Sequence, residues 1–578
     1  MKQLMLGNEA VARGLYEAGC AFVSSYPGTP STEITEAAAR YPEICAEWAP
    51  NEKVAMEAAF GASLAGRRSF CGMKHVGLNV AADPLFTISY TGVNGGMVIA
   101  VADDAGMHSS QNEQDSRHYA KAAKLPMLEP SDSQEALEYT RLAYELSEAF
   151  DTPVLMKMCT RISHSQSVVE PGEREEAAPR PYEKNGEKYI MMPGNAKRRH
   201  PVVEERLAKM ADWAEHASVN RIEAGTDYKM GVITSSTSYQ YVKEACGDTY
   251  PVLKLGMVWP LPEKKIRTFA KSVSLLVVVE ELDGFIEEYC RNLGLACAGK
   301  NFFPAIGELS QNLVARQLTH RETSGLKLDE VIPPRPPVMC AGCPHRGLFY
   351  TLAKNKLTVL GDIGCYTLGA VAPLGAMDST VCMGASISGL HGFNKAGGNE
   401  GRTVAVIGDS TFMHSGVTGL INAAYNESSS TVIILDNSIT GMTGHQQNPT
   451  TGFNLKGDPC AKIDLESLCR AVGIERVRVV DPYDLAECDG AVREELAAPG
   501  PSVIISRRPC ALLKYVKHPG PIAADPDRCV GCKSCMRIGC PAISVSGGKA
   551  VIDNTLCTGC GVCAQLCRFD ALSGKKEA

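Results

Sequence analysis

Short apolar runs alternate with helical patterns along most of the chain. In the first 165 residues, apolar runs occupy 21–27, 95–103 and 152–159, and 52–66 has a helical pattern. A second series of apolar runs lies at 231–236 and 274–282, and a third at 403–408, 431–437 and 501–506. Apolar strands that alternate with helices are typical of parallel sheets. The chain is therefore predicted to be an α/β protein with three such units.

Polar and proline-rich stretches mark the limits of these units. Residues 166–230 are charged and poor in apolar runs, which predicts a linker or covering arm. Prolines crowd 331–338, where neither a helix nor a central strand can continue. We therefore expect domains at 1–165, 231–330 and 338–516. The tail, 520–573, has too few bulky apolar residues to form a core by packing alone, so something else must hold it together.

Composition and charge exclude several classes of protein. The 578 residues are 44% hydrophobic and 21% charged, as in ordinary globular proteins. The net charge of −7 gives no basic surface for nucleic acid or an acidic membrane. The N-terminus lacks the apolar core of a signal peptide, and the longest aliphatic run, 275–279, is far below the ~20 residues that span a bilayer. We expect a cytoplasmic protein without nucleic-acid or membrane partners.

Cysteines are concentrated in the tail, where eight of the 23 lie between Cys529 and Cys567. Without a secretory signal, such a cluster indicates metal ligands rather than disulfides. Two runs of four match the two-cluster ferredoxin arrangement, in which three cysteines of one run and the fourth of the other hold each [4Fe–4S] cube. The first tail set is then Cys529, Cys532, Cys535 and Cys567, and the second tail set is Cys557, Cys560, Cys563 and Cys540.

Two features of these runs depart from the usual pattern. Four residues separate Cys535 from Cys540 where three are usual, and Arg568 follows Cys567 where proline is usual. Neither change removes a ligand. The alternative is a pair of structural four-cysteine zinc sites, which do not need the third closely spaced cysteine.

Polar residues follow two neighbouring predicted strands. Gly408, Asp409 and Ser410 end one strand, and Asp436 and Asn437 end the next. The carboxyl ends of parallel strands meet at one edge of a sheet. A carboxylate, an amide oxygen and a backbone carbonyl just beyond Asn437 suit a divalent cation that also binds phosphate.

A helix that begins near Ser415 would direct its first amides at the phosphate. The spacing is similar to the thiamine diphosphate motif, Gly-Asp-Gly followed by Asn-Asn, although Ser410 and Asp436 replace one residue in each half. The alternative is that both segments are simple turns after buried strands.

Further motifs occur in one order along nearly the whole chain. They are YPGTPSTE (26–33), NEKVAMEAAFGASLAG (51–66), MKHVGLNVAADP (73–84), CAGCPHR (340–346), GDIGCYTLG (361–369), MGASI (383–387), IGDSTFMHSG (407–416) and TGMTGHQ (440–446). With the tail, they resemble the 2-oxoacid:ferredoxin oxidoreductases, in particular large subunits of the indolepyruvate type. The resemblance implies two thiamine diphosphate-binding domains (1–165 and 338–516), a smaller α/β domain like the C-terminal domain of transketolase (231–330) and a bacterial-type two-cluster ferredoxin domain.

The resemblance also implies roles for single residues. Glu52 would contact N1′ of the aminopyrimidine, with Glu57 as its rival, and Thr29 would lie near the 2-oxo acid. His75 and Asn79 would face the same pocket, although a lone histidine is as often structural. A guanidinium suits a carboxylate, so Arg117 is the candidate partner of the substrate carboxylate. The expected cofactor-binding residues are His345, Gly408, Asp409, Ser410, Asn437, Thr443 and Gly444, and the expected Mg²⁺ ligands are Asp409, Asn437 and Ile439.

Four cysteines outside the tail also match family positions. This proximal set comprises Cys340, Cys343, Cys365 and Cys510. The resemblance implies that it holds a third [4Fe–4S] cluster beside the thiazolium. The alternative is that these are buried thiols, which are common in protein cores.

The implied reaction converts an arylpyruvate, coenzyme A and two oxidised ferredoxins into arylacetyl-CoA, CO₂ and two reduced ferredoxins. The two cofactor-binding halves of thiamine enzymes often belong to different subunits, so a dimer of this chain is expected. The resemblance also implies a small β subunit, and hence an α2β2 assembly. Three alternatives remain: another 2-oxoacid:ferredoxin oxidoreductase, a non-oxidative thiamine decarboxylase, and an electron-transfer subunit without catalysis. The tail argues against the decarboxylase, and the presence of Asp409, Asn437 and Glu52 argues against the electron-transfer subunit.

Overall fold

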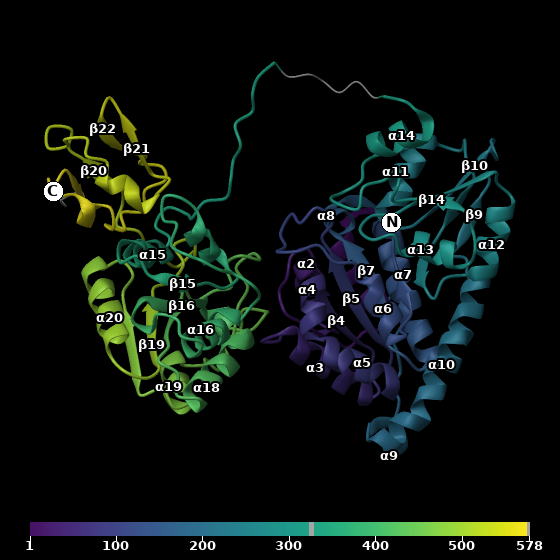
Figure 1. The fold of residues 1–578 in the computed structure, drawn as a ribbon. Helices are drawn as coiled ribbons and strands as arrows, with labels where there is room; N and C mark the ends of the chain where they lie inside the picture. Colours follow the sequence, from purple (N-terminus) through teal and green to yellow (C-terminus); the bar gives the residue numbers. More distant parts are fainter. Residues whose placement is uncertain (323–328, 575–578) are drawn as a thin grey trace. The chain divides into compact units, whose positions relative to one another are not determined.

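The computed structural model describes residues 1–322 and 329–574, and these fall into two compact units (Figure 1). The first unit is Met1–Asp329 and the second is Glu330–Ala578. The division lies directly before the proline-rich stretch 331–338.

A seven-stranded sheet forms the first half of the first unit. Its order is β12-β6-β7-β5-β4-β2-β3, and every neighbouring pair is parallel except β12 with β6. All residues of β4, β5 and β7 are buried, as expected for a parallel sheet covered by helices on both faces. The strands are β2 (Phe22–Ser25), β3 (Cys45–Trp48), β4 (Ser69–Lys74), β5 (Met97–Asp103), β6 (Met127–Leu128), β7 (Val154–Cys159) and β12 (Met257–Trp259).

The helices of this half connect or cover its strands. They are α1 (Gly7–Glu17), α2 (Thr32–Ala38), α3 (Glu52–Leu64), α4 (His75–Val80), α5 (Ala82–Thr91), α6 (Arg117–Ala123), α7 (Ser133–Phe150) and α8 (Thr160–His164). Two outlying strands, β1 (Gln3–Leu6) and β8 (Gln166–Val169), pair with each other in antiparallel fashion. The helix predicted at 52–66 is present as α3.

A smaller sheet follows, in the order β14-β13-β10-β11-β9, and only β9 is antiparallel to its neighbour. Its strands are β9 (Arg221–Glu223), β10 (Met230–Thr234), β11 (Val252–Lys254), β13 (Leu275–Val279) and β14 (Cys297–Ala298). Its helices are α11 (Ser236–Cys246), α12 (Glu263–Lys271), α13 (Phe285–Asn292) and α14 (Gln311–Thr319). One buried apolar cluster combines residues of both sheets and of their helices, among them Ile99 of β5, Met56 of α3, Ile233 of β10 and Phe269 of α12.

The charged segment 166–230 is more ordered than a linker. After α9 (Gly186–Tyr189), the 24-residue α10 (Pro193–His216) runs along the unit and contacts α5 and α12 (Figure 1). The same segment supplies β8 and β9, while β12 returns from the second sheet region to the edge of the first sheet. Strands of three or four residues are too short to show a hydrophobic period. For this reason the hydrophobic pattern of the sequence did not predict β8 and β9, or the pairing of β12 with the first sheet.

The second unit is built on a five-stranded parallel sheet, ordered β15-β16-β17-β19-β18. Its strands are β15 (Thr358–Leu360), β16 (Thr403–Gly408), β17 (Thr431–Asp436), β18 (Arg476–Val480) and β19 (Ser502–Arg507). Its main helices are α15 (His345–Lys354), α16 (Ala385–Lys395), α18 (Val417–Tyr425), α19 (Leu465–Ala471) and α20 (Leu485–Ala497), with single 3-10 turns at Cys365–Ala370 and Glu400–Arg402.

The helix after β16 begins earlier than the sequence indicates. Helical backbone starts at α17 (Asp409–Thr411), passes through a π turn (Phe412–Gly416) and continues as α18, so the expected start near Ser415 is wrong. Serine, threonine and histidine are poor helix formers, which obscures this start in the sequence. The helix therefore begins at the edge of the sheet, at Asp409 itself.

The tail forms a small two-layered appendage of the second unit. Strand β20 (Ile522–Ala524) pairs with β23 (Leu572–Gly574), and β21 (Ile543–Ser546) pairs with β22 (Lys549–Ile552). Gly547 and Gly548 both have positive φ, 56° and 75°, as a two-residue hairpin turn requires. Single 3-10 turns occupy Ser534–Ile538 and Ala564–Leu566.

Candidate active site and cysteine groups

Asp409, Asn437 and the Ile439 carbonyl converge at the edge of the second unit's sheet. One terminal atom of the Asn437 side-chain amide lies 3.2 Å from Asp409 Oδ1 and 2.9 Å from the Ile439 carbonyl oxygen. With its nitrogen at this point the amide donates to both oxygens, and with its oxygen there it presents a third oxygen ligand to a cation. Ligands of an octahedral Mg²⁺ at 2.0–2.1 Å lie about 3 Å from one another. These residues therefore fit a hard divalent cation.

The electrostatics of this edge also favour a cation. Burial, followed by the charge of Asp436, raises the pKa of Asp409 to about 7. The carboxylate receives hydrogen bonds from Ser410 N (2.8 Å) and Thr450 Oγ1 (3.2 Å), which orient it. A bound divalent cation would favour the charged form of this carboxyl.

The other expected cofactor-binding residues lie around this edge at different depths. Thr440 Oγ1 donates to Ser410 Oγ at 2.9 Å. His345 is buried at the start of α15, its ring is edge-on to Tyr366 with 6.0 Å between centroids, and burial lowers its pKa to about 4. A Cβ on Gly408 would lie 2.6 Å from the same Tyr366 ring, so only glycine fits there.

The loop that contains Thr443 and Gly444 is folded back on itself. Thr443 Oγ1 donates to Gln446 Oε1 at 2.6 Å, and Gly444 is exposed with a φ of +120°. The structure thus gives Thr443 a partner within its own loop, and its expected contact with the cofactor stays a prediction.

We call the sheet edge formed by Asp409, Asn437 and the Ile439 carbonyl the metal edge. The proximal cysteines gather beside it. Cys343 N donates to the Cys340 carbonyl oxygen at 3.1 Å. Cys365 and Cys510 both lie against the loop that follows Asn437, because Cys365 Sγ is beside Gly441 and Cys510 Sγ is 3.8 Å from His445 Nε2. Cys340 also influences the pKa of both Cys343 and Cys365, which agrees with a single group of four thiols. Cys510 N donates to the Asn437 carbonyl at 2.9 Å, which joins this set to the metal edge. Burial raises the pKa of Cys343 to about 12 and that of Cys365 to about 11. Both are therefore neutral thiols unless a metal takes the proton's place.

Two cavities in the tail are each lined by one complete tail set. The first tail set lines one cavity with apolar residues such as Val545 and Leu572, and the second tail set lines the other with Ile522 and Val562. The second cavity is also lined by Cys343, so the proximal set adjoins the second tail set. Cys535 of the first tail set and Cys563 of the second belong to one buried apolar cluster, so the two tail sets adjoin each other.

Buried polar atoms support the occupation of these cavities by an anionic group. Arg346 Nε and Thr558 Oγ1 are buried, have no hydrogen-bond partner among the described residues, and belong to residues that line the second cavity. Three sulfurs already accept backbone N–H groups, from Ile522 to Cys557 (3.4 Å), from Ala550 to Cys529 (3.3 Å) and from Ala571 to Cys567 (3.3 Å). Such hydrogen bonds are a common way of tuning an iron–sulfur cluster.

In the first unit, Glu52 is the first residue of α3 and is buried, with 4% of its surface exposed. Its charge acts on Lys74, the last residue of β4, whose pKa is lowered by burial against the opposing charges of Asp104 and Glu52. Lys74 Nζ donates to the Ser109 carbonyl at 2.8 Å, and its stem packs against Gly28, beside Thr29. Thr29, Glu52 and Lys74 thus cluster at the carboxyl edge of this sheet.

The remaining expected residues of this site are placed differently from one another. Glu57 is exposed and pairs with Lys53. His75 is buried at the start of α4, and its Nε2 donates to the Asn112 carbonyl at 3.1 Å. Asn79 is exposed and accepts a hydrogen bond from Tyr119 at 2.7 Å. The structure therefore separates buried Glu52 from exposed Glu57.

Arg117 lies in a closed network of ion pairs. Its guanidinium is fully buried, donates through Nε to Asp115 at 2.9 Å and through Nη1 to Glu280 at 2.5 Å, and reaches the carbonyl oxygens of Glu281 and Asp283 through Nη2. This placement argues against the expected contact with a substrate carboxylate, because the donors are already engaged. Arg117 instead ties the end of the first sheet to the end of β13.

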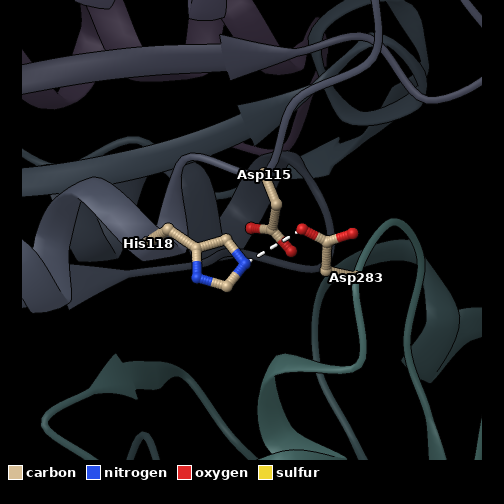
Figure 2. A group of neighbouring side chains, drawn as sticks. All are labelled: Asp115, His118 and Asp283. Carbon is tan, nitrogen blue, oxygen red and sulfur yellow. Dashed lines mark hydrogen bonds and ion pairs between the residues drawn. The ribbon is translucent and has the colours of Figure 1, made fainter.

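Figure 2 shows Asp115, His118 and Asp283 in this region, whose ligand atoms all lie within 4.8 Å of one another. His118 Nε2 is 2.9 Å from Asp283 Oδ2. Asp115 already pairs with Arg117, whose positive charge opposes a cation at this point. We therefore interpret this group as part of the ion-pair network.

Sequence reasoning missed three residues of these sites. Thr450 lies thirteen residues beyond the nearer of the two predicted motif strands, 431–437, yet it donates to Asp409 and orients it. Lys74 and Arg346 lie inside motifs that were recognised, directly before His75 and after His345. Their position in MKHVG and CPHR was the available signal.

Comparisons with known proteins agree with this geometry. Residues 13–227 match the family described as "Pyruvate flavodoxin/ferredoxin oxidoreductase, thiamine diP-bdg". Residues 362–506 match the C-terminal TPP-binding domain of thiamine pyrophosphate enzymes. Residues 550–573 match a 4Fe-4S binding domain. The indolepyruvate oxidoreductase subunit IorA of Archaeoglobus fulgidus is 41% identical over 100% of this chain and 98% of that protein. The IorA subunit of Pyrococcus horikoshii is 39% identical over 100% of this chain and 97% of that protein.

A more distant relative is the 2-oxoglutarate synthase subunit KorA of A. fulgidus, 25% identical over 52% of this chain and 96% of that protein. Fold and site thus define a thiamine diphosphate-dependent 2-oxoacid:ferredoxin oxidoreductase with an iron–sulfur tail. Within that class, the chain belongs to the family of indolepyruvate oxidoreductase IorA subunits.

Within 1–322 and 329–574, every helix is too short or too polar to cross a bilayer.

Proposed function

We propose that this chain catalyses the oxidative decarboxylation of arylpyruvates, indolepyruvate among them. In the balanced reaction, the 2-oxo acid anion, coenzyme A and two oxidised ferredoxins give arylacetyl-CoA, CO₂, two reduced ferredoxins and one proton. The observation that carries this proposal is the continuous series of cysteine sets that begins at the metal edge. A decarboxylase without an oxidative step would have no electrons to pass along it.

The metal edge is proposed to hold the diphosphate part of the cofactor. Asp409, Asn437 and the Ile439 carbonyl would bind Mg²⁺, and the first amides of α17 would face the phosphates. Thiamine diphosphate supplies the electron sink that decarboxylation of a 2-oxo acid needs. Gly408 leaves room for the ring of Tyr366 at the end of β16, next to His345.

In the first unit, Glu52 is the proposed partner of the aminopyrimidine. Its place at the start of α3 is fixed by the Asn51 side chain, which accepts from Val54 N at 2.9 Å. Lys74 takes over the role expected of Arg117, because a buried ammonium beside Thr29 can bind a substrate carboxylate. His75, whose pKa is lowered by burial and then by the charge of Lys74, is neutral and supports the adjoining turn.

The three cysteine sets are proposed to hold one [4Fe–4S] cluster each. The proximal set adjoins the metal edge, the second tail set adjoins the proximal set, and the first tail set follows. This order leads electrons from the cofactor to the first tail set, where ferredoxin would collect them. We also propose a small β subunit, in an α2β2 assembly, and coenzyme A as the acyl acceptor.

The test is a reduction assay of the complete complex. Indolepyruvate, phenylpyruvate, pyruvate and 2-oxoglutarate are compared side by side, with and without coenzyme A, by reduction of ferredoxin or a viologen dye. Faster reduction with the two aromatic acids, dependent on coenzyme A, is expected. Faster reduction with pyruvate or 2-oxoglutarate would change the substrate class, and CO₂ release without dye reduction would support the non-oxidative decarboxylase.

Iron content tests the number of clusters. Three cubes of four irons predict about twelve irons per chain after anaerobic purification, and about eight in Cys343→Ser. Cys469→Ser is a matched control, because Cys469 is a buried thiol of α19 outside all three sets. About eight irons in the wild type, unchanged by Cys343→Ser, would remove the proximal cluster.

A further inference from the structure

Arg346 links the start of the thiamine-binding domain to the tail. It lies in the first turn of α15 and is 3% exposed. Nη2 donates to the carbonyl oxygens of Met339 (2.6 Å) and Cys340 (3.0 Å), and Nη1 donates to those of Ile538 (2.7 Å) and Gly539 (2.6 Å). Nη2 thus holds the backbone of Cys340, a proximal cysteine, and Nη1 holds Gly539, the residue directly before Cys540.

The charge of this guanidinium is not compensated by protein. Among residues 1–322 and 329–574, all four acceptors of Arg346 are backbone carbonyls, and its Nε has no acceptor. A buried cation without a counter-charge is unfavourable. The charge does act on two thiols, Cys343 of the proximal set and Cys560 of the second tail set. A cube ligated by four thiolates is anionic, so two clusters here would supply the missing negative charge.

We propose that Arg346 is a positioning residue for electron transfer: it holds the proximal and second tail sets at a fixed separation, and its charge favours the reduced form of both clusters. This inference rests on the proposed function, because it requires clusters in both sets. If both sets hold clusters, one electron would pass from the proximal cluster, which would be oxidised, to the next cluster, which would be reduced, and no bond would form or break. Ferredoxin would be the oxidant that finally receives the electron.

The three sets provide an internal comparison. Arg346 lines the cavity of the second tail set and contacts Cys340, but it does not line the cavity of the first tail set. Loss of its charge should therefore shift the potentials of the two flanking clusters and leave the third cluster near its original value. A structural defect of the whole tail would instead shift the two tail clusters and spare the proximal cluster, whose cysteines lie outside the tail.

The experiment is a dithionite titration of the anaerobic holo-complex, followed by electron paramagnetic resonance, with iron counted in parallel. Arg346→Met removes both the charge and the hydrogen bonds to the two backbone segments, whereas Arg346→Lys keeps the charge. For Arg346→Met we expect the equilibrium constant for one-electron reduction of the flanking clusters to fall at least tenfold, which is 59 mV. Arg346→Lys should shift it much less, yet slow the reduction of the tail by substrate in stopped flow, because one ammonium cannot hold both segments.

Arg476→Met is the matched control, because Arg476 also donates to backbone carbonyls, those of Ala498, Pro499 and Gly500, and is paired with Glu495 away from the cysteines. It should leave all three potentials unchanged. Unchanged potentials in Arg346→Met, or an equal shift of all three clusters, would overturn the proposal. If Arg346→Met loses iron while Arg346→Lys retains it, the need for the charge is supported, and iron loss in both variants would show a purely structural role.

Failure of the proposed function is separable from failure of this inference. The titration uses dithionite and needs no substrate, so it does not depend on which 2-oxo acid is oxidised. Absence of a third cluster would already appear in the iron content of the wild type, before any Arg346 variant is compared with it.

Discussion

Replacing Arg117 by methionine should destabilise the first unit rather than impair substrate binding. The side chain is fully buried between Asp115 and Glu280, which it joins across the two sheets of the unit. Methionine fills a similar volume but leaves two buried carboxylates without their cation. Breaking a buried pair in this way costs about 3–5 kcal/mol.

The pKa of Asp115 gives an independent scale for this figure. Burial raises it, but the charge of Arg117 and its hydrogen bonds outweigh burial and lower it from 3.8 to about 2. At 1.36 kcal/mol per unit, this corresponds to about 2–3 kcal/mol of stabilisation from Asp115 alone. The pKa of Glu280 is raised by burial despite Arg117, so this carboxyl will take up a proton readily once the arginine is gone.

The pH dependence follows from these directions. In the wild type, the folded pKa of Asp115 lies below its unfolded value, so its contribution is present above about pH 4 and is lost as the pH falls towards 2. In Arg117→Met, the folded pKa values of Asp115 and Glu280 should both lie above their unfolded values. The stability difference between variant and wild type should therefore be largest at pH 7 and shrink as the pH falls and these carboxyls are protonated.

Urea unfolding followed by tryptophan fluorescence measures this difference, because Trp48, Trp213 and Trp259 all belong to the first unit. Arg161→Met is the matched control: Arg161 also bridges the two sheet regions, with two bonds to Glu308 (2.7 and 2.6 Å), but its side chain is 54% exposed. It should cost about 0.2–1 kcal/mol. An unchanged urea midpoint in Arg117→Met, with a raised KM for the 2-oxo acid, would refute this reasoning and restore the substrate contact.

Three further predictions concern the candidate site. Asp409→Ala should abolish Mg²⁺-dependent retention of thiamine diphosphate in gel filtration and leave the tail clusters intact. The control variant Asp464→Ala, which removes an exposed helix cap, should retain the cofactor. Retention of the cofactor by both variants would exclude Asp409 as a ligand. Glu52→Gln should lower kcat by roughly 10²–10⁴-fold with the cofactor still bound, and exposed Glu57→Gln should change it little; the reverse result would identify Glu57 as the partner of the aminopyrimidine. Lys74→Met should raise KM for the 2-oxo acid at least roughly tenfold, the value of one charge-assisted hydrogen bond, and an unchanged KM would exclude Lys74 from the substrate site.

Much of the architecture was readable from local pattern. The long buried strands β5, β7, β16 and β17 consist of continuous apolar runs, because a parallel sheet covered on both faces leaves no polar side to its central strands. The cysteine spacing of the tail and the polar residues after β16 and β17 were equally visible, because ligands at a strand end or in a tight loop are close in sequence as well as in space.

Tertiary structure decided what depends on residues distant in the chain. No local period in the sequence indicates that β9 and β12 belong to different sheets. The same is true of the ion pair between Arg117 and Glu280, which are 163 positions apart, and of the hydrogen bond from Arg346 to the Gly539 carbonyl. Burial also distinguishes Glu52 from Glu57: both are glutamates of α3 five positions apart, and only the packing of the helix shows that one is buried and the other exposed. The physical reason is the same in each case, because the charge and the hydrogen-bonding capacity of a side chain are properties of the residue, whereas its partners are properties of the fold.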